Sequence, residues 1–286
     1  MKPAAFAYLR PDSLSAALEA LALHGPDARV LAGGQSLMPM MALRVAQPAV
    51  LVDISRIEQL RGILATPSSI QIGALMRHAE VLGSAVVAER LPLLSLALPH
   101  VAHAAIRNRG TLGGSLALAD PAAEMPACAL ALNAVMHIEG QAGRRSVAAS
   151  EFFQGLYTTA VQDGEILAAV EFPAAMPGDR AFFDEVSRRR GDYAIAGLAA
   201  VRTSGHEVRL AFLGCGDRPQ RSSKAESLIA EHLNRGQQPA RSDIRDALGA
   251  DLDPPSDLQA DADTRLHLAA VLVERASKSW LAGDTP

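Results

Sequence analysis

Two glycine pairs, each beside small hydroxyl side chains, are the residues of this chain best suited to hold an anion. Gly33-Gly34 is followed by Ser36, and Gly113-Gly114 stands between Thr111 and Ser115. Glycine has no Cβ, so its main-chain N–H can approach a phosphate closely, and a hydroxyl adds a further donor. The two segments together would suit a pyrophosphate. The alternative is that each is an ordinary tight turn.

Two common nucleotide-binding motifs are absent from the sequence. A P-loop needs Gly-Lys-Ser/Thr, and none of the three lysines, Lys2, Lys224 and Lys278, follows a glycine. The pattern Gly-x-Gly-x-x-Gly begins at Gly214-Cys215-Gly216 but continues with Asp217-Arg218-Pro219. A phosphate would therefore be bound by a different arrangement.

The first glycine pair is expected to follow a short strand. The apolar spacing predicts a helix from Leu14 to about Ala22, which the segment 25–27 ends with a glycine and a proline. The β-type run 29–31 leads into the glycine pair, and a second strand is expected at 49–54.

The remaining elements alternate between strands and helices. We expect a strand at 69–73, mostly helix over 79–98, a polar glycine-rich interval at 107–115, a compact apolar run at 127–136, and a turn and strand over 161–172. The segment 173–178, with two prolines and a glycine, is the expected linker. Beyond it we expect strands near 182–187, 197–201 and 208–214 and helices near 224–234, 242–248 and 264–281. This order favours the α+β class.

Composition restricts the kind of protein. A chain of 286 residues predicts two domains at roughly 150 residues each, and 49% apolar with 20% charged residues is typical of globular proteins. A net charge of −4 and only 4% aromatic residues argue against a nucleic-acid partner. No run approaches the roughly 18 apolar residues of a membrane span. We therefore expect a cytoplasmic protein.

The two cysteines, Cys128 and Cys215, are too few for a self-contained iron–sulfur cluster, which needs about four thiolates. They fit a reducing compartment. Two histidines, His100 and His103, lack an accompanying carboxylate or thiol cluster, so we expect no metal site there.

Four segments stand in register with one known family: AGGQSLMP (32–39), IRNRGTLGGSL (106–116), DPAAE (120–124) and RRRGDYA (188–194). In order and spacing they resemble the FAD-binding medium subunits of the molybdenum hydroxylases. That family includes xanthine dehydrogenase, aerobic carbon monoxide dehydrogenase and the bacterial N-heteroaromatic hydroxylases. The resemblance extends over essentially the whole chain.

The resemblance implies an α+β fold in two domains. Residues 1–175 would form a two-subdomain FAD-binding domain of the vanillyl-alcohol-oxidase-like (PCMH) type, with subdomains of about 1–56 and 57–175. Residues 178–286 would form a C-terminal α+β flavoprotein domain of the carbon monoxide dehydrogenase type.

The resemblance also implies the FAD contacts. The implied cofactor-binding residues are Ala32, Gly33, Gly34, Gln35, Ser36, Leu37, Val101, Thr111, Gly113, Gly114, Ser115, Ala117, Glu124 and Tyr193. The two glycine segments would hold the pyrophosphate, Glu124 would contact the polar chain of the flavin, and Tyr193 would lie near the isoalloxazine ring or else be an ordinary core tyrosine. Neither glycine segment contains a histidine or cysteine, so we expect noncovalent binding.

Two departures from the family pattern stand out. Leu118 occupies a position where relatives often have histidine, and Asp184 and Glu185 occupy a stretch where some relatives have lysine. The run Arg188–Arg190 could bind phosphate, face a partner subunit or be solvated.

The function implied by the resemblance is electron transfer in a complex. The chain would be the flavoprotein subunit of a heterotrimer with a large molybdopterin subunit and a small subunit carrying two [2Fe-2S] clusters, and two heterotrimers would form a dimer. No residue here is expected to act on the substrate, which would be an N-heteroaromatic compound or carbon monoxide. The alternatives are a stand-alone flavin-dependent dehydrogenase or oxidase, and a non-enzymatic assembly factor.

Overall fold

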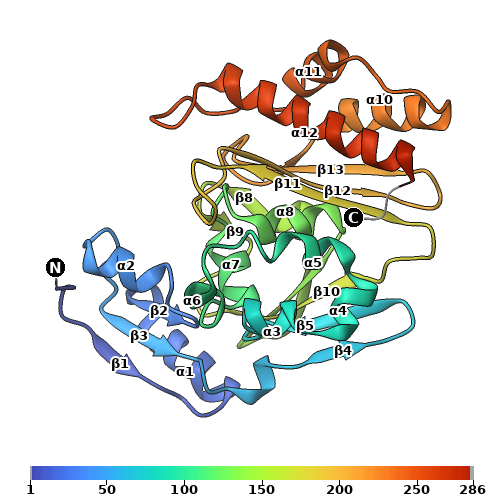
Figure 1. The fold of residues 1–286 in the computed structure, drawn as a ribbon. Coiled ribbons are helices and arrows are strands. Elements are labelled where there is room, and N and C mark those ends of the chain that lie inside the picture. The colour runs from blue at the N-terminus through green and yellow to red at the C-terminus, as the bar shows by residue number, and fades with distance from the viewer. Residues whose placement is uncertain (1, 284–286) are drawn as a thin grey trace.

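The fold consists of stacked layers of sheet and helix. The computed structural model describes residues 2–283, and within them four sheets are present. In Figure 1 the C-terminal helices lie over one sheet, further helices lie beneath that sheet, and a second sheet follows, while the N-terminal segment lies to one side.

The N-terminal segment contains a three-stranded parallel sheet of order β1-β3-β2. Its elements are β1 (Ala7–Leu9), α1 (Leu14–His24), β2 (Ala28–Leu31), α2 (Leu37–Ala42) and β3 (Val50–Asp53), with 3₁₀ turns at Gly25–Asp27 and Glu58–Leu60. The hydroxyl of Ser13 caps α1 by accepting a hydrogen bond from the amide of Ala16. One face of this sheet packs on α1, in a core that Leu75, Ile166 and Ala168 of the following segment complete.

The middle segment contains a five-stranded antiparallel sheet of order β4-β5-β10-β6-β7. Its strands are β4 (Ile63–Ala65), β5 (Ser69–Gly73), β6 (Val135–Gly140), β7 (Gly143–Ala148) and β10 (Ile166–Pro173), and a small hairpin is formed by β8 (Phe153–Gly155) and β9 (Thr158–Thr159). Its helices are α3 (His78–Leu82), α4 (Ala85–Arg90), α5 (Pro92–Ala97), α6 (Ala104–Arg107), α7 (Leu112–Leu118), α8 (Glu124–Ala131) and α9 (Ala149–Phe152).

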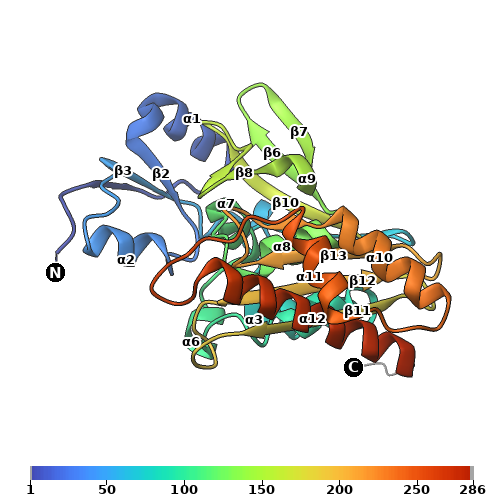
Figure 2. The same cartoon turned by 90° about the horizontal axis from the view of Figure 1, so that it is seen from above.

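The C-terminal segment contains an antiparallel sheet of order β11-β12-β13-β14. Its elements are β11 (Arg180–Val186), β12 (Ala196–Arg202), β13 (Val208–Leu213), β14 (Gln220–Arg221), α10 (Ser223–Asn234), α11 (Arg241–Gly249) and α12 (Ala262–Ala282). Figure 2 shows α10, α11 and α12 next to one another above this sheet, and α10 and α12 contact β13 and β12. Helices α5 and α8 contact its other face.

Both faces of this sheet are buried, which explains why β12 and β13 are apolar except for Arg202, the last residue of β12, and Arg209 of β13. Successive side chains of a strand point to opposite faces. On β12, Leu198 belongs to the core beneath α10–α12, whereas Ala199 belongs to the core shared with the middle segment. On β13, Phe212 likewise belongs to the core beneath α10–α12, and Leu213 belongs to the core shared with the middle segment. The C-terminal sheet is therefore part of two hydrophobic cores.

The expected linker lies between β10 and β11, because β10 ends at Pro173 and β11 begins at Arg180. The packing does not separate at this point, since Phe183 of β11 belongs to the core of the middle segment. The division into 1–175, with its two subdomains, and 178–286 stays a prediction.

The segment 79–98 is mostly helical, as expected, but it is divided into three helices, because Ser84 begins a new helix as its N-cap and Pro92 stands at the start of another. The polar glycine-rich interval 107–115 is partly helical: Gly113 and Gly114 lie in the first turn of α7. Thr111 explains this start, since its hydroxyl caps the helix.

Within residues 2–283, none of the helices combines the length and apolar character needed to cross a membrane.

Candidate functional site

The two glycine segments are in main-chain contact, although they are far apart in the sequence. A Cβ atom at Gly33 would clash with the carbonyl oxygen of Arg109 and would lie 2.8 Å from the Cα of Gly110. A Cβ at Gly114 would lie 3.9 Å from the Cβ of Ala32. This approach is possible only because position 33 has no side chain.

The first segment is positioned by the parallel sheet. It leaves the carboxyl end of β2, where the carbonyl of Leu31 accepts a hydrogen bond from Ile54 of the β3 end at 3.0 Å. Gly34 has φ +72°, a conformation that favours glycine, and the side-chain amide of Gln35 donates to the carbonyl of Gly33 at 2.9 Å. Ligands of open parallel sheets bind beyond this strand end.

The main-chain amides of the first segment are available to a ligand. None of residues 2–283 accepts a hydrogen bond from the N–H of Gly33, Gly34, Gln35 or Ser36. The segment itself is only half-buried. Four free donors on a short, partly exposed turn match the needs of a phosphate group.

The second segment uses its two glycines differently. Gly113 is buried, its N–H donates to the carbonyl of Ala74 at 2.9 Å, and a Cβ there would lie 2.7 Å from the Cα of Ala74. The N–H of Gly114 donates to the hydroxyl of Thr111 at 3.1 Å. Gly113 therefore allows α7 to pack closely, whereas Gly114 lies on the side of Ala32, and both Gly114 and Ser115 are half-buried.

A buried histidine supports the second segment. The N–H of His78 donates to the carbonyl of Gly110 at 3.0 Å, and its ring packs against that glycine. Burial, and next the charge of Arg107, lower the pKa of His78 to about 4. His78 is therefore neutral at pH 7 and acts as a packing residue.

Two exposed tyrosines flank a buried carboxylate beyond α7. The hydroxyl of Tyr157 donates to Oδ2 of Asp120 at 3.2 Å, and the amide of Ala122 donates to Oδ1 at 2.9 Å. Burial and then the charge of Asp120 raise the pKa of Tyr157 to about 12, and the same two causes raise the pKa of Tyr193. Tyr157 and Tyr193 are 52% and 60% exposed, so each offers a ring face to a ligand.

Tyr157 was missed by the sequence reasoning. It stands at the tip of the β8–β9 hairpin with φ +52°, which is uncommon for a bulky residue and concentrates at functional sites. The sequence does not reveal that conformation. Asp120 could have been found, because it begins one of the four segments that resemble the family.

Glu124, at the start of α8, faces other titratable groups. Burial, and next the charge of Glu185, raise the pKa of Glu124 to about 8. Glu185 in turn pairs with His100, whose Nδ1 lies 3.4 Å from Oε1 of Glu185. Glu124 is thus protonated at pH 7 in this structure and can donate a hydrogen bond rather than only accept one.

The other expected FAD-contacting residues are dispersed. Leu37 begins α2 immediately after the first glycine segment. Val101 is buried and its carbonyl accepts a hydrogen bond from Arg107, while Ala117 is exposed on α7. The role of each expected residue toward FAD stays a prediction.

The residues present fit the pyrophosphate of a dinucleotide cofactor. Free amides and a main-chain approach that a Cβ would block meet between the two glycine segments, and each segment also contains a half-buried serine, Ser36 or Ser115. No cluster of three or more His, Cys, Asp or Glu side chains able to hold a metal ion occurs in the part of the chain described, residues 2–283.

Comparison with known proteins gives the class of the fold and the family. Residues 4–175 match the family model of the FAD binding domain in molybdopterin dehydrogenase, and residues 181–280 match that of the CO dehydrogenase flavoprotein C-terminal domain. The chain has the fold of the flavoprotein subunits of molybdenum hydroxylases.

Relatives match over nearly their full length. The chain is 38% identical over 280 residues to the 6-hydroxypseudooxynicotine dehydrogenase complex subunit alpha of Paenarthrobacter nicotinovorans, covering 96% of this chain and 94% of that one. It is 38% identical over 286 residues to the carbon monoxide dehydrogenase medium chain of Hydrogenophaga pseudoflava, covering 98% and 99%. It superposes on quinoline 2-oxidoreductase from Pseudomonas putida 86 with a TM-score of 0.91 at 37% identity, covering 100% of both chains. The chain therefore belongs to the family of FAD-binding medium subunits of molybdenum hydroxylases, and the expected α+β fold and family are confirmed.

Proposed function

We propose that this chain is the FAD-binding electron-transfer subunit of a heterotrimeric molybdenum hydroxylase. It would connect two [2Fe-2S] clusters of a small partner subunit to an external electron acceptor, while a large partner subunit carries the molybdopterin cofactor. The observation that carries the proposal is the main-chain contact between Gly33 and the Arg109–Gly110 turn, which brings the two candidate phosphate-binding segments together.

This chain's residues would bind and orient the cofactor noncovalently. The amides of Gly33 to Ser36 and the hydroxyl of Ser115 would hold the pyrophosphate, and Tyr193 and Tyr157 would offer ring faces to the flavin. Glu124 would hold a proton beside the cofactor's polar chain. When bound, FAD supplies both one- and two-electron chemistry, which suits a junction between one-electron clusters and an external acceptor.

The partners and substrate are proposed from the relatives. Their names refer to a dehydrogenase complex, a medium chain and quinoline oxidation, so we propose a cytoplasmic dimer of heterotrimers. The substrate would be an N-heteroaromatic compound or carbon monoxide.

Co-production with the large and small subunits tests this proposal. We expect native mass spectrometry to show a complex with one FAD per copy of this chain, and flavin absorbance to decrease when substrate is added without oxygen. A complex that retains both partners but contains no FAD would contradict the proposal and favour an assembly factor. Substrate oxidation by the FAD-loaded chain alone would favour a stand-alone dehydrogenase or oxidase.

A further inference from the structure

A second feature of the molecule is a cavity where the middle and C-terminal segments meet. It has a volume of about 370 Å³ and is lined by Pro99, His100, Glu185, Val186, Ser187 and Arg190. Pro99 and His100 follow α5, while the other four residues belong to the end of β11 and the turn after it. Its size lies within the range of small-molecule sites, which favour such junctions.

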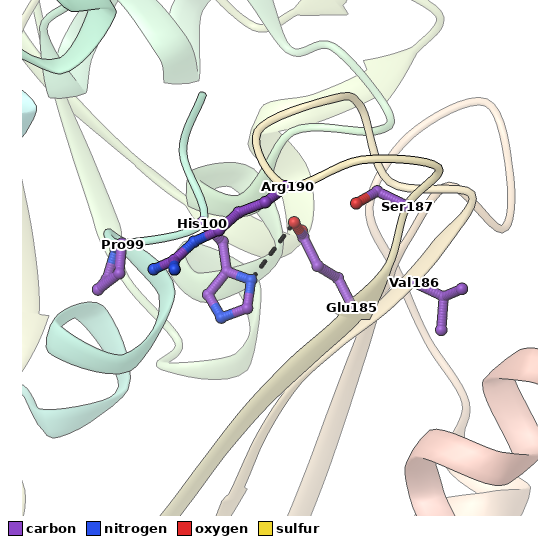
Figure 3. A pocket seen from close by; sticks show the side chains of 6 residues that line it. All are labelled: Pro99, His100, Glu185, Val186, Ser187 and Arg190. Atoms are coloured by element: carbon purple, nitrogen blue, oxygen red, sulfur yellow. Dashed lines mark ion pairs between the residues drawn. The ribbon is translucent and has the colours of Figure 1, made fainter. Parts of the chain in front are cut away.

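The side chain of His100 is fixed at the wall of this cavity by two residues of β11. Its Nδ1 lies 3.4 Å from Oε1 of Glu185, and its ring meets the ring of Phe183 edge to face, with centroids 5.0 Å apart. Phe183 and Glu185 are two residues apart on one strand and so share a face. Figure 3 shows the His100–Glu185 pair with Arg190 beside it.

Glu185 is itself deeply buried. Its side chain is 3% exposed, and its second oxygen, Oε2, has no hydrogen-bond partner within residues 2–283. A buried carboxylate beside an imidazole stabilises the cationic form of the ring, and here Glu185 is the main cause of the raised pKa of His100. Asp184 and Glu124 act on His100 in the same direction.

The three consecutive arginines after β11 differ in what they contact. The guanidinium of Arg188 donates to the carbonyl of Leu258 at 3.0 Å, so it ties the turn to the segment before α12. Only Arg190 of the three lines the cavity. Gly191, with φ +87°, follows it and packs against His103, where a Cβ would lie 2.7 Å from the ring. The turn that carries Arg190 is thus held against the same loop that carries His100.

We propose that this cavity binds a small organic anion, whose carboxylate or phosphate group lies between the guanidinium of Arg190 and the ring of His100. Arginine binds carboxylates and phosphates through paired hydrogen bonds. Glu185 acts as the positioning residue that orients His100. The carboxyl groups facing His100 are those of Glu185, Asp184 and Glu124, and the charged residues on the cavity wall are Glu185 and Arg190. Burial keeps Glu124 protonated to about pH 8, which limits the negative charge near the anion.

This inference extends beyond FAD binding and does not depend on it. Calorimetric titration of the full chain, both FAD-loaded and stripped, would use benzoate, inorganic phosphate and the neutral analogue benzamide at constant ionic strength. We expect benzoate or phosphate to bind in both forms, with the tighter of the two giving the class of anion, and benzamide to bind at least ten-fold more weakly.

Three variants sharpen the test. Arg190→Gln should weaken anion binding at least ten-fold, while the matched control Arg189→Gln, which removes the same charge one residue away, should change it less than two-fold. In the wild-type chain we expect the affinity for the anion to fall as pH rises, because His100 loses its proton, and His100→Gln should lack this fall. In Glu185→Gln the fall should occur at lower pH, because the carboxylate that stabilises the protonated ring is absent.

Equal effects of Arg190→Gln and Arg189→Gln, or no measurable binding, would overturn the proposal. Binding seen only in the stripped chain would assign the cavity to the cofactor and would also overturn it. None of these results bears on whether FAD binds between the glycine segments.

Discussion

The main chain at Gly33 packs directly on the carbonyl group of Arg109, and this contact joins two segments that are distant in the sequence. It places the free amides that follow β2 beside the start of α7. The proposed binding of the cofactor depends on this contact, because a pyrophosphate between the segments needs both of them close to it.

Replacing Gly33 should therefore weaken FAD binding. The Cβ of Gly33→Ala would meet main-chain atoms of Arg109 and Gly110, which cannot rotate away as a side chain can. Such overpacking costs about 1–3 kcal/mol. We expect the dissociation constant for FAD, measured by fluorescence titration of the stripped chain, to rise at least ten-fold. Gly205→Ala is the control, since the new Cβ would meet only ordinary van der Waals contacts. We expect this variant to bind FAD as tightly as the wild type. Equal affinities for all three proteins would show that the contact is irrelevant to the cofactor.

Gly113 should affect folding more than cofactor binding. A Cβ there would collide with Ala74, and the amide of Gly113 is already bonded to the carbonyl of Ala74. We expect Gly113→Ala to lower the free energy of unfolding of the stripped chain by about 1–3 kcal/mol, measured by urea denaturation. An unchanged denaturation midpoint would mean that α7 does not need this close approach.

Two variants of Gly114 distinguish the effect of an added side chain on FAD binding from the effect of an added negative charge. Gly114→Ala and Gly114→Asp both place a Cβ 2.8 Å from the hydroxyl of Thr111, but only aspartate adds a carboxylate next to the proposed phosphate site. We expect Gly114→Asp to weaken FAD binding at least ten-fold more than Gly114→Ala, and the difference to shrink at high salt because screening weakens the repulsion. If both variants bind FAD equally, no phosphate lies beside Gly114.

The sequence predicted the glycine segments, the family and the C-terminal strands and helices, for identifiable physical reasons. The segment 208–213 is apolar except for Arg209, a pattern typical of a strand buried on both faces, and β13 is such a strand. The helical periodicity at 224–234 likewise matches α10.

What the sequence could not predict depends on tertiary contacts. The hydrogen bond from the amide of Gly113 to the carbonyl of Ala74 requires α7 to pack on the end of β5. The pairing of His100 with Glu185 requires the register of β11 against the loop after α5, and the left-handed conformation of Tyr157 depends on the turn of its hairpin. None of these leaves a local signal in the chain.

Glu124 should make stability fall as pH rises. Its pKa is raised from 4.5 to about 8 in the folded chain, mainly by burial. Between these values the unfolded chain loses the proton while the folded chain keeps it, so unfolding becomes easier with increasing pH, by at most about 1.4 kcal/mol per pH unit. We expect Glu124→Gln, which stays neutral, to show a flatter dependence of melting temperature on pH between 5 and 8 and to exceed the wild type at pH 8. Parallel pH profiles for the two proteins would contradict the burial of this carboxyl group.

A crystal structure of the FAD-loaded chain would show whether both glycine segments hold the pyrophosphate. We expect phosphate oxygens within about 3.2 Å of main-chain nitrogens of Gly33 to Ser36 on one side and of donors in the Thr111–Ser115 segment on the other. A pyrophosphate bound elsewhere, or in contact with only one of the two segments, would contradict this expectation.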